Sequence, residues 1–154
     1  MLETVIVVVA GVGGASLMTL FLGVVNYLIP QGVRVPLILA QVVHHYLNGA
    51  PFYKVRHKNY YGHTLHLLVG VFFAFCYSWL WRRDIGGFTL EDILLFGLVN
   101  GLVGMAGWFV FLRTTYEPEQ VNENAFFPVI LIAHVPFALG VTVIYFGLWS
   151  LIDG

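Results

Sequence analysis

The sequence predicts an all-α protein that forms a four-helix transmembrane bundle. Its composition is 59% hydrophobic and 10% charged, against roughly 45 to 50% and about 25% in soluble proteins. Four segments are also apolar over about 20 residues, the length that crosses a hydrocarbon core of roughly 30 Å. Because fifteen charged residues, the seven Lys and Arg and the eight Asp and Glu, cannot coat a globule of this size, a water-soluble domain is excluded. The net charge of -1, without a basic run, excludes nucleic acid as a partner.

The first two spans are bounded by helix-stopping residues. The first span is predicted over residues 4–29, and Pro30 and Gly32 end it. The second is predicted over residues 63–81, and Arg82 with Arg83 follows its last turn. The first is retained as a membrane span, because it lacks the basic start of a signal peptide.

The last two spans carry signals at their starts. Thr89, followed three residues later by Asp92, predicts a capping box for the third span, over residues 90–112. Arg113 suits its C-terminal end, where cationic side chains are favourable. Pro128 fits the first turn of the fourth span, predicted over residues 128–152. The whole chain is therefore one membrane domain.

The loop between the first and second spans contains a shorter apolar segment. Residues 35–47 predict a helix that is too short to cross, so it lies at the interface or re-enters the bundle. The segment after it mixes aromatic and basic side chains, a composition typical of anchors at lipid headgroup level. We expect partner or lipid contacts from Lys54, Arg56, Lys58, Tyr60 and Tyr61.

An even number of crossings places both termini and the loop 82–89 on one side, called side B, and the two longer loops on side A. Basic residues concentrate in cytoplasmic loops. Side A carries Arg34, Lys54, Arg56, Lys58 and Arg113, whereas side B carries Arg82 and Arg83. The long loops are therefore predicted to be cytoplasmic and the termini outside.

A weak internal repeat relates the two halves of the chain. Aligning the second span with the fourth superposes His66 on His134 and Tyr77 on Tyr145. Two explanations stay open, a duplicated two-helix hairpin with an axis along the membrane normal and chance matches between apolar helices.

The histidines are the most informative polar residues. All six lie on side A or in the side A half of a helix, and ionisable groups at membrane depth often mark functional sites. His66 and His134, on two helices, are the expected axial ligands if a b-type haem is bound. His63, His66, His134 and Glu117 are the expected ligands if a transition metal is bound. Otherwise these histidines only hydrogen-bond a neighbouring helix.

Glycines at small-residue spacings predict close helix packing. Gly11 and Gly14 of the first span are expected to pack against Gly97, Gly101 and Gly104 of the third. Alternatively, one of the two sets faces a partner subunit. Asn26 and Asn100 lie deep enough in their spans to need a hydrogen-bond partner and suit either arrangement.

The segment Gly62-His63-Thr64-Leu65-His66, continued through Phe73 to Tyr77, resembles an uncharacterised family of small four-span bacterial membrane proteins. The fourth span, with Ala133-His134, Gly140 and Tyr145, is similar as well. The resemblance implies a four-span fold, histidines in the second and fourth spans, and the bacterial inner membrane. It implies no activity.

We therefore expect a small integral membrane protein that is a non-catalytic accessory subunit or helper of a larger membrane complex. Its partners would be the lipid bilayer and other membrane subunits, or a second copy of the chain. No catalytic residues are predicted, because Ser16, Ser78 and Ser150 have no recognisable base nearby in the sequence. Two alternatives are an electron-transfer module that uses His66 and His134, and a small transporter or channel.

Overall fold

All regular secondary structure is helical over the residues that the computed structural model describes, 1–28, 35–48, 60–114 and 122–153. The helices are α1 (Leu2–Leu28), α2 (Val35–Asn48), α3 (Tyr60–Trp81), α4 (Leu90–Thr114) and α5 (Glu123–Asp153). All except α2 are long and apolar enough to cross a membrane. The prediction of a helical bundle with four spans is confirmed, and the chain is an integral membrane protein.

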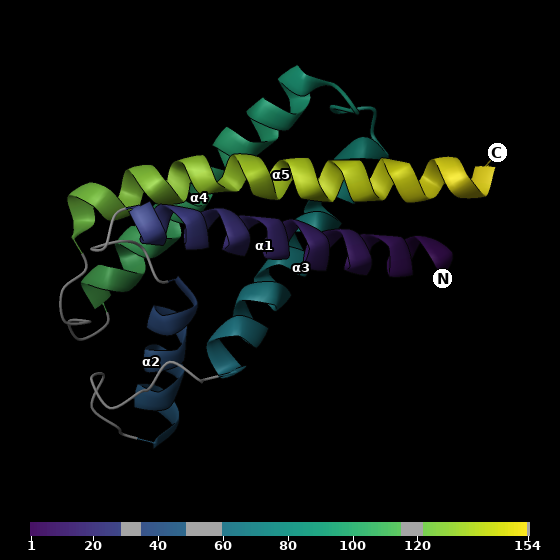
Figure 1. The fold of residues 1–154 in the computed structure, drawn as a ribbon. Helices are drawn as coiled ribbons and strands as arrows, with labels where there is room; N and C mark the ends of the chain where they lie inside the picture. The colour runs from purple at the N-terminus through teal and green to yellow at the C-terminus, as the bar shows by residue number, and fades with distance from the viewer. Residues whose placement is uncertain (29–34, 49–59, 115–121, 154) are drawn as a thin grey trace.

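α1 and α5 form the central pair of the bundle. They run side by side in opposite directions, with both chain termini at the same end (Figure 1). At their crossing, a Cβ added to Gly140 would lie 2.9 Å from the Cα of Gly14. The absence of side chains at both positions therefore lets the two backbones touch.

The predicted glycine pairing is wrong, although the glycines do lie at close helix approaches. Gly11 packs against α3, where a Cβ would lie 2.6 Å from the Cα of Val71. Gly97 and Gly101 instead meet α5 at Val135 and Leu131. Because α5 packs against both α1 and α4, the glycines of α1 and α4 contact different neighbours rather than each other.

α5 begins five residues earlier than the predicted span. The backbone N–H groups of Ala125 and Phe126 donate to the carbonyl of Asn122, at 3.0 and 2.8 Å, and so start the helix before Glu123. Pro128 consequently lies in the second turn instead of the first. Its missing N–H deprives Asn124 of a partner, and because Asn124 is exposed, solvent can satisfy that carbonyl.

The connection between α3 and α4 is well defined on side B. The Thr89 hydroxyl donates to Asp92 Oδ2 at 2.7 Å and accepts from the Asp92 N–H at 3.1 Å, so this predicted cap is confirmed. Near the same end, Tyr77 of α3 and Phe96 of α4 have ring centroids 4.9 Å apart. This contact joins the two helices close to their loop.

A polar cluster ties the start of α1 to the end of α3. Glu3 accepts a hydrogen bond from the Ser78 hydroxyl at 2.9 Å and pairs with Arg82 at 3.4 Å. The N-terminus and the loop 82–89 therefore lie at the same end of the molecule, as four crossings require.

The short helix α2 packs against the first turns of α3. A Cβ at Gly62 would collide with the carbonyl of Pro36 and lie 2.8 Å from the N of Ala40, so only glycine permits this approach. Figure 1 shows α2 lying at a steep angle to α1 and α5, near the end of the bundle opposite the termini. This position, which is the side A end, suits the predicted interfacial helix.

Candidate functional site

His66 and His134 face one cavity, although they lie on different helices and 68 positions apart. Each side chain is 8% exposed, and both line a cavity of about 340 Å³. That volume lies at the lower end of the range for small-molecule sites, roughly 300 to 1,000 Å³. The structure thus places at one cavity the two histidines that are superposed when the second span is aligned with the fourth.

The cavity lies in the wedge between α3 and α4. These helices meet through Tyr77 and Phe96 near side B but form no extended contact. α1 packs along α5, and in a symmetric duplication α3 would pack along α4 in the same way. The cavity occupies the place of this missing contact, so the two halves, if they are duplicates, have diverged there.

The walls of the cavity are mainly apolar and come from all five helices. Gly107 on α4 leaves room, because a Cβ at this position would meet nothing within 4 Å. The aromatic side chains of the lining are Phe73, Trp108, Phe111 and Phe137. Apolar walls with a few convergent polar groups are typical of small-molecule sites.

His134 has a defined ring orientation. Its Nδ1 lies 2.7 Å from the carbonyl oxygen of Ile130, which can only accept, so Nδ1 carries the proton. Its ring packs on Gly104, where an added Cβ would lie 2.7 Å from Cε1 and 2.9 Å from Nε2. Because an imidazolium is costly in an apolar site, the ring is expected to be neutral, which leaves a lone pair on Nε2.

His66, like His134, has a ring that has a backbone neighbour and lines the cavity. Its ring interacts with the backbone of Ala15 on α1. Its Nε2 is buried and has no hydrogen-bond partner among the residues that the structure describes. A buried polar atom without a partner is rare in native proteins and points to a missing ligand or water.

Asn100 is the third polar side chain of the cavity. It is 4% exposed, and its Nδ2 has no partner within the described part of the chain. It lies next to Tyr77, whose hydroxyl donates to the carbonyl of Phe96 at 3.1 Å. The sequence marked Asn100 only as a polar residue deep in a span, so its place in this site was missed.

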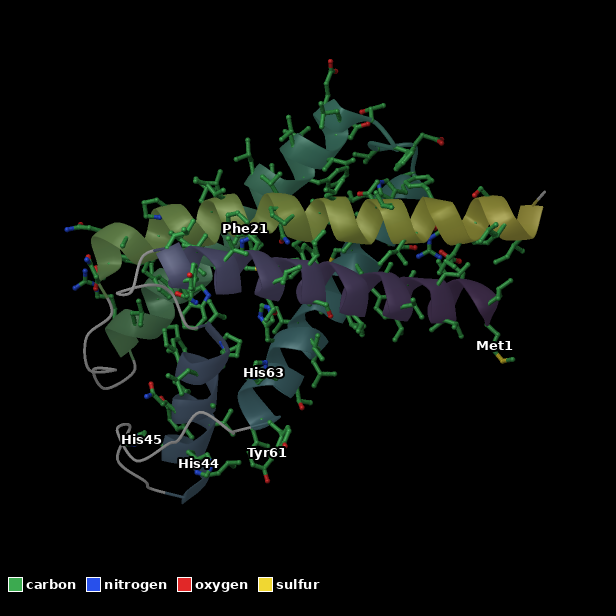
Figure 2. The ribbon with its side chains drawn as sticks, in the orientation of Figure 1. Met1, Phe21, His44, His45, Tyr61 and His63 are labelled. Carbon is green, nitrogen blue, oxygen red and sulfur yellow. The ribbon has the colours of Figure 1, made fainter. Side chains whose placement is uncertain are left out.

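The structure does not bring His63 to the histidine pair. His63 is exposed although it is only three residues before His66, and Figure 2 shows it on α3 beyond Tyr61. Glu117 lies outside the described residues. Within those residues, no three His, Cys, Asp or Glu side chains gather as a metal site.

The predicted partner or lipid contacts are only partly visible. Lys54, Arg56 and Lys58 lie outside the described residues. Tyr60 and Tyr61 are 81% and 62% exposed at the start of α3. The Tyr61 ring lies edge-on to His44 of α2, with centroids 6.0 Å apart (Figure 2).

Comparisons with protein-family models, curated proteins and solved structures found no significant match. The function must therefore be argued from the chemistry of the cavity.

Proposed function

We propose that this chain is a non-catalytic accessory membrane protein that binds a small membrane-soluble molecule in the cavity between α3 and α4. One observation carries the proposal. His66, Asn100 and His134 converge from three helices on an apolar cavity, and all three side chains are more than nine-tenths buried. Polar groups at membrane depth are costly, so their retention at one place favours a ligand that satisfies them.

The lipid phase is the natural source of this molecule. Val69 on α3 and Val103 on α4 line the cavity and are 43% and 53% exposed. In a bilayer, apolar exposed residues at the level of a span face acyl chains. A molecule dissolved in the membrane can therefore enter sideways between α3 and α4.

Quenching of Trp108 fluorescence tests the proposal, because this indole lines the cavity. We expect 1-bromo-4-octylbenzene, added to the protein in lipid nanodiscs, to quench a saturable fraction of the tryptophan fluorescence. The Trp108→Phe variant should lose that saturable fraction. It should keep the linear quenching of Trp79, which is 49% exposed and is quenched by the bromoarene dissolved in the lipid. Linear quenching alone in the wild type would contradict the proposal.

Cofactor binding by His66 and His134 is a second candidate, supported by the orientation of His134. Metal-ligating histidines commonly donate their second N–H to a carbonyl, as Nδ1 does to Ile130. Both Nε2 atoms then provide lone pairs, which suits axial ligation of a b-type haem or binding of a transition metal with a further ligand.

An absorption spectrum distinguishes this second candidate. If haem is bound, the protein purified from haem-replete cells shows a Soret band, and both His66→Phe and His134→Phe abolish it. A colourless protein that also lacks metal by elemental analysis excludes cofactor ligation and leaves the small-molecule site as the function of the cavity.

The accessory role also rests on the surface chemistry of side A. The chain is small, and its basic residues gather around the long loops, where headgroups or other membrane subunits are the expected partners. A second copy of the chain is the alternative partner. The same distribution favours cytoplasmic long loops and external termini. The resemblance to small four-span bacterial membrane proteins favours the bacterial inner membrane.

A further inference from the structure

We propose that the ligand of the cavity between α3 and α4 carries a hydroxyl group on an aromatic ring, as alkylated phenols do. This inference rests on the proposed function and specifies the chemical class of its ligand. It follows from the donors and acceptors that the cavity offers and from the shape of its walls.

The histidines offer acceptors. Because Nδ1 of His134 donates to Ile130, its Nε2 can only accept a hydrogen bond in the neutral ring. At His66 the ring already interacts with the backbone of Ala15, and its Nε2 is buried without a partner in the described structure. A ligand that satisfies these atoms must donate a proton, which ketones, ethers and esters cannot do.

Asn100 offers the complementary group. Its Nδ2 is a donor that forms no short hydrogen bond among the described residues, with the Tyr77 hydroxyl as its nearest polar neighbour, so a ligand in the cavity can offer it an acceptor. A hydroxyl does both, since its O–H donates to a histidine while its oxygen accepts from the amide. An ammonium group has no acceptor, and the described lining supplies no charged partner for a carboxylate in this apolar place.

The walls favour a flat ring with an apolar tail. Phe73, Trp108 and Phe137 line the cavity, and aromatic rings pack well in offset or edge-to-face geometry. The mouth at Val69 and Val103 lets a tail extend into the lipid. A phenol with an alkyl chain fits this combination of polar floor, aromatic walls and lateral opening.

A matched pair of probes tests the hydroxyl directly. 4-Octylphenol and 4-octylanisole share a ring and tail, but methylation removes the donor from the anisole. Each is used to displace 1-bromo-4-octylbenzene from the full-length protein in nanodiscs, with its lipid concentration calibrated in empty nanodiscs. We expect the phenol to displace the bromoarene at a concentration about tenfold lower than the anisole requires, which is the effect of one satisfied buried hydrogen bond.

Variants attribute this preference to the histidines. His66→Phe and His134→Phe each remove one acceptor while keeping a ring. In at least one of these variants, the phenol and the anisole should displace the bromoarene at nearly equal concentrations, so that the ratio of the two concentrations is near one. Gly147→Leu, where a Cβ would meet nothing within 4 Å and which does not line the cavity, should keep the wild-type ratio. The wild-type ratio remains a test even if a histidine variant fails to fold.

The outcomes separate the inference from the proposed function. Equal displacement by phenol and anisole in the wild type overturns the hydroxyl requirement and leaves an apolar small-molecule site. If the phenol, the anisole and the bromoarene all fail to bind saturably, both the hydroxyl requirement and the proposed function are overturned. A wild-type preference that both histidine variants retain overturns the assignment of the acceptors to His66 and His134.

Discussion

Replacing Gly14 by leucine is expected to separate α1 from α5 and to lower the free energy of unfolding by about 3 kcal/mol or more. A Cβ at Gly14 would lie 2.5 Å from Val141 Cγ2 and 2.8 Å from the carbonyl oxygen of Phe137. The second contact is with backbone, which cannot rotate away, so the helices must move apart. Equilibrium unfolding in a denaturing detergent, followed by circular dichroism, measures the change.

Gly147→Leu on α5 is the matched control for this prediction. It makes the same chemical change in the same helix pair, but a Cβ there has open space. Its free energy of unfolding should stay within about 0.5 kcal/mol of the wild type, as for most surface substitutions. If Gly14→Leu proves as stable as Gly147→Leu, the α1–α5 crossing at Gly14 and Gly140 is wrong.

Gly107→Leu is expected to abolish saturable binding in the cavity while leaving the bundle folded. A Cβ at this position meets nothing within 4 Å, and the residue lines the cavity, so the larger side chain enters the empty space without a backbone collision. Because the cavity measures only about 340 Å³, a leucine side chain fills much of the room that a ligand ring requires. Displacement of the bromoarene by 4-octylphenol should become undetectable.

The comparison again uses Gly147→Leu, which should bind like the wild type. Circular dichroism of both variants checks that helix content is unchanged. A Gly107→Leu protein that binds with wild-type affinity would show that the ligand lies elsewhere on the molecule.

The fold was largely predictable because local patterns decide it. Length and hydropathy located the spans, and the Thr89–Asp92 pair located the start of α4 within one residue. The start of α5 was missed because Pro128 is a good first-turn residue, whereas the actual start depends on the backbone carbonyl of Asn122. A main-chain acceptor of this kind has no signature in the side-chain pattern.

Helix partners were less predictable than helices. Small residues indicate that a close approach exists but carry no information about which helix approaches. Gly11 and Gly14 are three positions apart, yet the first contacts α3 and the second α5. Only the three-dimensional arrangement, with α1 held between two neighbours, assigns them.

The candidate site was half predictable. His66 and His134 stood out because histidine is scarce in spans, and the repeat related them. Asn100 could not be assigned to them from the sequence, since its helix neighbours and the wedge between α3 and α4 are properties of packing. His63 was grouped with His66 by spacing alone, but its side chain turns outward and is exposed.

Photolabelling gives the most direct test of the claim that the cavity between α3 and α4 holds a ligand. The protein in nanodiscs is irradiated with a phenyl diazirine, with and without excess 4-octylphenol, and the modified residues are mapped by mass spectrometry. We predict that competitor removes labelling at Phe73 and Trp108 and leaves labelling at the exposed Phe72 and Leu102 unchanged. If competitor leaves the labelling of all four residues unchanged, the claim is contradicted.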